Sequence, residues 1–215
     1  MKQQETNFEC GRRGSNRHRG FSLLEMTVVI ALILIVSAIA VIKLQPVLQD
    51  AKTDVAMRQV LDQLRQAREY SIANRRYIQV TFPIVVVGGK TQYQIVMTQR
   101  NDLTVGGAAA NPVLSTVPIQ APATFLSFGG VDTPDAYGNA AAIEFAGVNG
   151  GPAAGMMFQS DGELVAGGTF LPINGTVFIG VAGQPTSARA ITVLGTTGRI
   201  RAWKTSANAA SWVQF

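Results

Sequence analysis

The sequence predicts an α+β fold in which one long N-terminal helix leads into an antiparallel sheet domain. Residues 21–42 form an apolar run that contains a single charged residue. Residues 47–74 then place apolar side chains at helical spacing, and from residue 77 onward short alternating segments are separated by glycine and other turn residues. At 215 residues, the chain is long enough for one globular domain plus additional elements.

The composition favours a sheet-rich or membrane-associated chain. Hydrophobic residues make up 47% of the sequence and charged residues only 14%, which is unlike a disordered protein. The formal net charge is +5, of which the first 20 residues contribute +3 and the rest of the chain only +2. Any interaction with nucleic acid must therefore depend on a local patch rather than on the overall charge.

The residue types available argue against an enzyme. The only cysteine is Cys10 and the only histidine is His18, so no disulfide, thiol nucleophile or histidine-based metal site or triad is expected downstream of them. The downstream carboxylates form no pattern typical of a two-carboxylate hydrolase: Asp132, Asp135, Glu144, Asp161 and Glu163. We expect no catalytic residues, no cofactor, no metal and no small-molecule substrate.

The run from Phe21 to Ile42 predicts a transmembrane helix. Twenty-two residues in a helix span roughly 33 Å, enough to cross the hydrocarbon core of a bilayer. The residues before the run are rich in arginine, which favours a cytoplasmic N-terminus: Arg12, Arg13, Arg17 and Arg19. The one charge inside the run, Glu25, is costly in lipid and needs an explanation.

Three interpretations of this region compete. A plain membrane anchor explains the length and the flanking charges, and a secretory signal would be cleaved after Ala38-Ile39-Ala40. Neither gives Glu25 a role. In a filament subunit, by contrast, the positive N-terminus of a neighbouring subunit can neutralise a carboxylate buried in lipid, which sets the register of each incoming subunit.

The stretch Arg19-Gly20-Phe21-Ser22-Leu23-Leu24-Glu25, followed by the apolar run, resembles the cleavage and methylation signal of type IV prepilins and type II secretion pseudopilins. The resemblance implies that a prepilin peptidase cuts after Gly20 and methylates the new N-terminal residue, Phe21. It also implies that Glu25 is retained for assembly. A glycine before the cut allows the peptidase to approach the backbone closely.

Beyond the apolar run, the helix is expected to continue as an amphipathic segment. Pro46 lacks a backbone donor and is expected to kink the helix where it leaves the membrane. The apolar positions at helical spacing are Leu48, Ala51, Val55, Leu61, Leu64, Ala67 and Ser71. The arginines of this region are better explained as a solvated helix face than as a binding stripe: Arg58, Arg65, Arg68, Arg75 and Arg76.

Strand signals occupy the remainder of the chain. Residues 77–82 alternate like a strand with residues 92–98 as partner, and Gly88-Gly89 predicts a hairpin turn, because the spacing of a nucleotide-binding loop is not met. Residues 101–123 and 147–152 are expected to be loops, and Asp161-Gly162 and Asn174-Gly175 to be turns. Further strands are expected at 124–128, 141–145, 155–159, 163–166, 176–181, 189–194 and 199–204.

Two segments narrow the resemblance to the GspH/FimT group of pilin-like proteins. Residues 64–80 look like that group's passage from helix to first strand, and residues 189–201 are similar to its closing hairpin. The resemblance implies a pilin-like fold and a structural subunit, a pseudopilin or minor pilin. Such a subunit serves a type II secretion or type IV pilus machine and assembles into a short filament through its N-terminal helix.

The same resemblance raises an alternative function. In the FimT branch, a C-terminal Gly-Arg-x-Arg motif like Gly198-Arg199-Ile200-Arg201 contacts DNA during natural transformation. On a strand, Arg199, Arg201 and Trp203 project from one face, and Lys204 is adjacent, a combination suited to phosphate pairing and base stacking. The competing explanation is an ordinary hairpin in which Gly195 and Gly198 form the turn and Trp203 stacks under an arginine.

The sequence thus predicts four segments: a leader over 1–20 that is removed, a transmembrane helix and filament-core segment over 21–45, an amphipathic continuation over 46–76 and a β-rich domain over 77–215. The expected location is the bacterial inner membrane, single-pass, with the C-terminal domain in the periplasm. The expected partners are other pilin or pseudopilin subunits, the prepilin peptidase and, in the alternative, DNA.

Overall fold

The computed structural model describes residues 21–103, 110–128, 133–137, 141–146, 156–206 and 211–215. The chain divides into two compact units, residues 1–44 and 45–215. One helix, α1 (Leu23–Asn74), contributes to both. Pro46 lies inside α1 rather than at its end, and the kink expected there remains a prediction.

In the first unit, the described part of α1 is apolar and exposed on every side. Its large side chains range from 44% exposed at Val29 to 82% exposed at Leu23. The helix is long and apolar enough to cross a membrane, as the sequence predicted.

In the second unit, α1 has a buried stripe instead. Its buried residues recur at helical spacing: Thr53, Ala56, Met57, Val60, Leu61, Leu64, Ala67 and Ser71. Three positions expected on the apolar face are exposed instead: Leu48, Ala51 and Val55. The sheets of the domain bury α1 only from Thr53 onward, and these three residues lie on a different side of the helix from the buried stripe.

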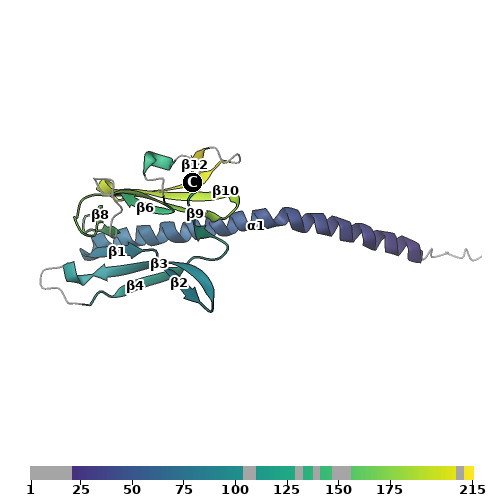
Figure 1. Ribbon diagram of the computed structural model, residues 1–215, viewed down its shortest axis with the longest axis horizontal. Coiled ribbons are helices and arrows are strands. Elements are labelled where there is room, and N and C mark those ends of the chain that lie inside the picture. The colour runs from purple at the N-terminus through teal and green to yellow at the C-terminus, as the bar shows by residue number, and fades with distance from the viewer. Residues whose placement is uncertain (1–20, 104–109, 129–132, 138–140, 147–155, 207–210) are drawn as a thin grey trace, which may run out of the picture. The chain divides into compact units, whose positions relative to one another are not determined.

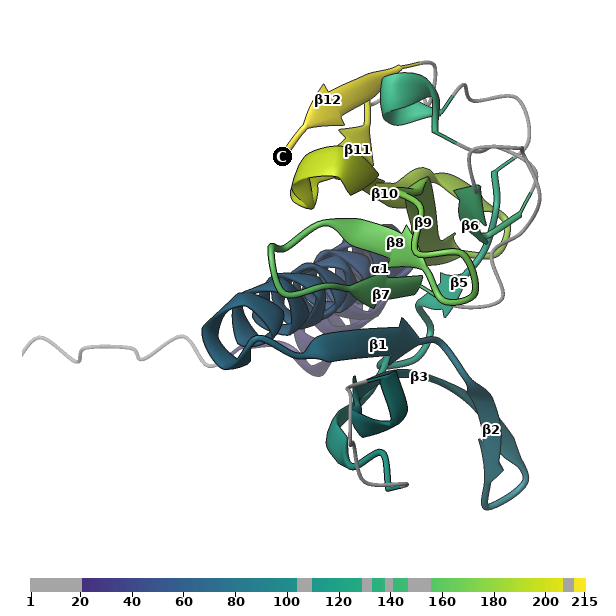
Figure 2. The ribbon, with the colours of Figure 1, turned by 90° about the vertical axis from the view of Figure 1, so that its left-hand side faces the viewer.

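Two antiparallel six-stranded sheets enclose this stripe, and Figures 1 and 2 show the second part of α1 lying between them. The first sheet has the order β2-β3-β1-β7-β8, with β4 also paired to β3. Its strands are β1 (Tyr77–Thr81), β2 (Ile84–Val87), β3 (Lys90–Arg100), β4 (Val113–Pro118), β7 (Met156–Phe158) and β8 (Leu164–Ala166).

The second sheet has the order β12-β11-β10-β9-β5, with β6 also paired to β9. Its strands are β5 (Thr124–Phe125), β6 (Ile143–Ala146), β9 (Asn174–Val181), β10 (Gln184–Leu194), β11 (Arg199–Thr205) and β12 (Trp212–Gln214). Three short 3-10 helices complete the described elements: η1 (Asn101–Leu103), η2 (Pro134–Ala136) and η3 (Gly195–Thr197).

The core joins both sheets to the helix. Its fully buried members come from α1 (Met57, Leu64), from the first sheet (Ile78, Phe158) and from the second sheet (Ile191). The predicted α+β, pilin-like fold, a long N-terminal helix packed against antiparallel sheets, is confirmed. Within the described part of the chain, α1 is the only α-helix, as expected.

Most predicted strands and turns are also confirmed. Strand β1 pairs with β3 in antiparallel register, and Gly88-Gly89, both with positive φ, form the turn between β2 and β3. The Asp161-Gly162 turn joins β7 to β8, and each of the seven further predicted strands overlaps an observed one.

Three expectations about loops and turns were wrong or incomplete. Residues 101–123 were expected to be a loop but contain β4, and neither β2 nor β12 was expected. Asn174-Gly175 was expected to be a turn but begins β9, where Gly175 pairs with both Phe145 and Val193. The Phe145 ring occupies the space that a Cβ at Gly175 would need, so this glycine permits close packing rather than a turn. The loop expected over 147–152 lies outside the described residues.

Candidate functional sites

The candidate arginine surface is built on the β10–β11 hairpin. The register pairs Thr192 with Arg201 and Ala190 with Trp203, so this hairpin is confirmed. Its turn is η3 followed by Gly198, which adopts the left-handed conformation with φ 60°. A Cβ at Gly198 would collide with the carbonyl oxygen of Gly162, so the turn also requires glycine for close approach to the β7–β8 turn.

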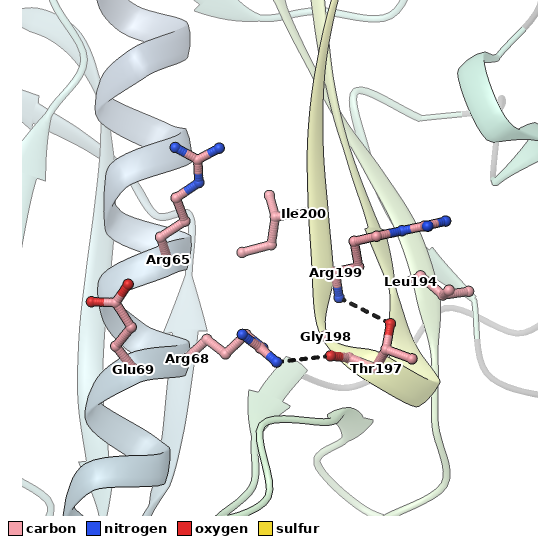
Figure 3. A pocket seen from close by; sticks show the side chains of 8 residues that line it. All are labelled: Arg65, Arg68, Glu69, Leu194, Thr197, Gly198, Arg199 and Ile200. Carbon is pink, nitrogen blue, oxygen red and sulfur yellow. Dashed lines mark hydrogen bonds between the residues drawn. The ribbon is translucent and has the colours of Figure 1, made fainter.

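The alternation predicted for β11 is confirmed. Ala202 is buried and Ile200 packs against the core, whereas Arg199 is exposed and Arg201 and Trp203 are half-buried. Figure 3 shows Ile200 pointing toward α1 and Arg199 pointing away from it. Arg199, Arg201 and Trp203 therefore belong to the outer side of the second sheet, and we call these three residues the outer β11 surface.

Within this surface, Arg201 already has partners. Its Nη1 lies 2.9 Å from Asp135 Oδ1 on η2, and its guanidinium carbon lies 6.0 Å from the centre of the Trp203 ring. Trp203 Nε1 donates to Thr192 Oγ1 at 3.0 Å, and Thr192 Oγ1 donates to Asp135 Oδ2 at 2.8 Å. The stacking of Trp203 with an arginine, which the sequence offered as the structural explanation, is present.

Lys204 is not part of the outer β11 surface. The alternation of β11 sends its side chain to the opposite side, and its Nζ lies 5.9 Å from the centre of the Phe215 ring. Arg58 of α1 lies over the same ring at 5.4 Å. Sequence adjacency suggested one cluster of four residues, but the strand geometry places Lys204 on the other side of β11 from the three residues of the outer β11 surface.

A groove of about 530 Å³ lies beside the turn, on the α1 side of β11 (Figure 3). Its lining residues are Arg65, Arg68, Glu69, Leu194, Thr197, Gly198, Arg199 and Ile200. Arg68 donates from Nε to Gly162 O at 3.3 Å and from Nη2 to Thr197 O at 3.1 Å, so it connects α1 to both turns. The solvated-face interpretation holds for the exposed Arg58, Arg65, Arg75 and Arg76 but was wrong for Arg68.

Two structurally important residues were missed from the sequence. Arg189, buried on β10, donates from Nε to Asp54 Oδ1 of α1 at 2.6 Å and from Nη1 to the carbonyl oxygens of Thr186 and Ala188. Asp135 was named only as a carboxylate without a catalytic pattern. The Arg189–Asp54 pair and the Arg201–Asp135 pair each join residues far apart in the chain, so no local sequence signal could have identified them.

The electrostatics of the described residues show one clear perturbation, outside these surfaces. The Arg100 side chain on β3 donates to Asp102, and chiefly this hydrogen bond lowers the pKa of the Asp102 carboxyl from 3.8 to about 2. The same hydrogen bond raises the pKa of Arg100. Among the residues that the structure describes, no group of three or more His, Cys, Asp or Glu side chains is placed to hold a metal ion.

At the other end of the chain, the residues of the predicted processing signal lie at the start of α1. Phe21 is 76% exposed, and Glu25 lies exposed in the first helical turn, where its charge is favourable for the helix dipole. Gly20 lies outside the described residues. A family model, the prokaryotic N-terminal methylation motif, matches residues 15–41.

The chain carries a prepilin-type signal. The matched segment includes Gly20, Phe21 and Glu25, the residues on which the resemblance was based. Together, the prepilin-type signal and the pilin-like fold indicate a type IV pilin-like protein, a class of typically structural, non-enzymatic proteins. Searches among curated proteins and among solved structures found no match. The GspH/FimT resemblance is not supported by these comparisons.

Proposed function

We propose that this chain is a structural subunit, a pseudopilin or minor pilin, of a type II secretion or type IV pilus machine. The observation that carries the proposal is the prepilin-type signal at the start of a helix whose first part is apolar on all sides. Such a helix needs an apolar environment, which lipid and neighbouring subunits can supply.

In this proposal, the arginines of residues 12–19 keep the N-terminus cytoplasmic, and α1 crosses the inner membrane with the sheet domain on the periplasmic side. The prepilin peptidase removes residues 1–20 and methylates Phe21. Glu25 then lies four residues from the new N-terminus and pairs with the positive N-terminus of an adjacent subunit during assembly. This pairing would offset the cost of a carboxylate in lipid.

Mass spectrometry of the mature protein tests the processing step. We expect the chain to begin at N-methylated Phe21. A chain that begins at Val41 would instead show a secreted soluble protein and would overturn the proposal.

Substitution of Glu25 tests the assembly step. Glu25→Gln preserves the size of the side chain but removes the charge, so we expect normal cleavage together with a loss of about tenfold in incorporation into filaments, a free-energy difference of about 1.4 kcal/mol. The control is Ser22→Ala, a change within the same segment that leaves the charge unaltered. If the Glu25→Gln variant is incorporated into filaments as well as the Ser22→Ala control, this role for Glu25 is refuted. A separate experiment, deletion of the gene in its host, distinguishes the two machines: loss of protein secretion indicates a type II secretion machine, and loss of pili indicates a type IV pilus machine.

A second candidate function is DNA binding through the outer β11 surface. The specific observation in its favour is that Arg199, Arg201 and Trp203 lie on one side of the hairpin, with Arg199 exposed. Guanidinium groups contact phosphates, and an indole ring stacks on bases or sugars. Lys204 is not required, since it lies on the other side of the strand.

The double variant Arg199→Ala with Arg201→Ala tests this candidate in a gel-shift titration at several salt concentrations. We expect weaker binding across all DNA sequences and a salt dependence that is shallower by about one unit for each lost phosphate contact. Lys204→Ala removes one positive charge from the opposite side of β11 and is the control. Equal affinity of the double variant and the wild-type protein would eliminate this surface as the DNA contact.

A further inference from the structure

One carboxylate occupies the outer side of the β10–β11 hairpin. Both oxygens of Asp135 are used: Oδ1 accepts from Arg201 Nη1 at 2.9 Å, and Oδ2 accepts from the Thr192 hydroxyl at 2.8 Å. Thr192 in turn accepts from Trp203 Nε1. Paired positions of two adjacent strands, Thr192 and Arg201, therefore converge on a single anionic group that comes from a separate segment, η2.

The chemistry of these donors suits a phosphate as well as a carboxylate. A guanidinium and a hydroxyl that bind two oxygens of one anion form the type of contact that arginine and threonine side chains make with the phosphates of DNA. Trp203 adds an aromatic ring beside the same position. The surface thus offers the elements of a nucleotide contact, but an internal carboxylate holds the anion position.

The contact of Asp135 is of a kind that a ligand can displace. The side chains of Arg201 and Asp135 are 31% and 17% exposed, so the ion pair is partly buried but still reaches the surface, where another anion can compete for the arginine. Asp135 and Ala136 both have positive φ, 59° and 56°, a conformation that side-chain-bearing residues disfavour. The η2 segment is not a strand of either sheet, so Asp135 can move away without breaking strand pairing.

We infer that the Asp135 carboxylate occupies a phosphate-binding position on the outer β11 surface, and that a DNA phosphodiester binds Arg201 and Thr192 only after displacing Asp135. The inference rests on the proposed DNA-binding function. Arg199, which is exposed, makes the first phosphate contact, and Arg201 becomes available for the second when Asp135 leaves. Asp135 thereby sets the affinity of the surface without itself contacting DNA.

The decisive variant is Asp135→Asn in the full mature chain, held in detergent micelles. Asparagine has nearly the same size as aspartate and tolerates positive φ well, so η2 retains its conformation while the charge is lost. We expect affinity for a short fluorescent DNA, tested as duplex and as single strand, to rise about fivefold, and the magnitude of the salt slope to increase by about 0.7 to 0.9. Asp135→Gly, which also accepts positive φ, should give the same result and guards against a folding defect specific to asparagine.

Asp102→Asn is the matched control. It removes the same charge from another aspartate that is paired to an arginine, Arg100, at 2.7 Å, but in η1, which follows β3 of the first sheet, rather than beside β11 of the second sheet. A general effect of net charge would appear equally in both variants. A larger gain in DNA affinity for Asp135→Asn than for Asp102→Asn would therefore reflect the release of Arg201.

A double-mutant cycle completes the experiment. Arg201→Ala should change DNA affinity less than twofold in the wild-type background, because the cost of displacing Asp135 offsets most of the phosphate contact, and should abolish the gain in the Asp135→Asn background. Suppose that the wild-type protein binds DNA but that Asp135→Asn raises the affinity no more than Asp102→Asn does. That result would overturn the inference and leave the DNA-binding function intact. If neither the wild-type protein nor any Asp135 variant binds DNA, the DNA-binding function itself is refuted.

Discussion

The two parts of α1 use similar side chains in opposite circumstances. Before residue 45, leucine, isoleucine and valine surround the helix and all are exposed, as Leu34 is at 65%. From Thr53 onward, the buried side chains are restricted to one stripe, which includes Leu64 at 0% exposure, and arginine, glutamine and aspartate fill the rest of the helix surface. The same element is thus covered by its own sheets in one part and uncovered in the other.

The difference shows how to separate folding from assembly in this protein. An apolar residue in the second part contributes to the stability of the domain through burial in its own core. An apolar residue in the first part cannot do so, since no described part of its own unit covers it. Substitutions in the two parts should therefore affect different measurements.

The largest expected effect comes from a leucine in each part. Leu64→Ala removes a fully buried side chain and should lower the free energy of unfolding of the domain by about 3 kcal/mol. Leu34→Ala should leave it unchanged within about 0.5 kcal/mol. Urea titration of the detergent-solubilised protein, followed by the fluorescence of Trp203 and Trp212, measures both. Equal effects of the two substitutions would contradict the comparison.

The next effect concerns the ion pair between α1 and β10. Asp54→Ala leaves the guanidinium of the buried Arg189 without its carboxylate and should lower the free energy of unfolding by about 2 kcal/mol. Asp62→Ala, an exposed acidic position on the same part of the helix, is the control and should have little effect. The same urea titration applies, and a loss no greater than that of the control would show that Arg189 finds other partners.

A smaller effect is expected from Gly198, in the β10–β11 turn that Arg68 contacts. Gly198→Ala introduces a Cβ at φ 60° against the carbonyl oxygen of Gly162, whereas Gly183→Ala introduces one at φ 78° into open space. Both should be destabilising, and Gly198→Ala should cost about 1 kcal/mol more, because close contact is added to the unfavourable φ. The difference in melting temperature between the two variants measures the excess. Identical melting temperatures would argue against tight packing of this turn.

The smallest effect should come from the Arg100–Asp102 pair, which joins the end of β3 to η1. Because the folded-state pKa of Asp102, about 2, lies below its ordinary value of 3.8, the pair stabilises the fold above about pH 4 and loses this contribution as the pH falls toward 2. Asp102→Asn should therefore lower the free energy of unfolding by a constant amount above about pH 5, and this deficit should shrink as the pH falls toward 2. Identical acid dependence of variant and wild type would show that the pair does not form in solution.

The success of the sequence-based predictions differed from element to element, for physical reasons. Period-two alternation identified β1 and β11, and Gly88-Gly89 identified a turn, because these signals are local. Strand β4 was missed, since its six residues include Pro118 and are exposed or only half-buried, which leaves little alternation. Asn174-Gly175 misled the prediction because glycine serves both turns and close packing, and the chain alone does not distinguish them.

The candidate sites show the same division. The prepilin-type signal is contiguous, so Gly20, Phe21 and Glu25 could be singled out by the resemblance of one short stretch to a prepilin cleavage and methylation signal. The outer β11 surface was predicted in part, because alternation placed Arg199, Arg201 and Trp203 together. Its occupation by Asp135, 66 positions away from Arg201, could not be predicted.

The sequence by itself determined the apolar first part of α1, the processing signal and the alternation of the strands, because each depends on residues that are close together in the chain. Only the tertiary structure decided which side of α1 is covered, that Arg189 pairs with Asp54, and that Arg201 is held by Asp135. These features depend on distant segments meeting in space, where burial and charge pairing, rather than local propensity, select the partners.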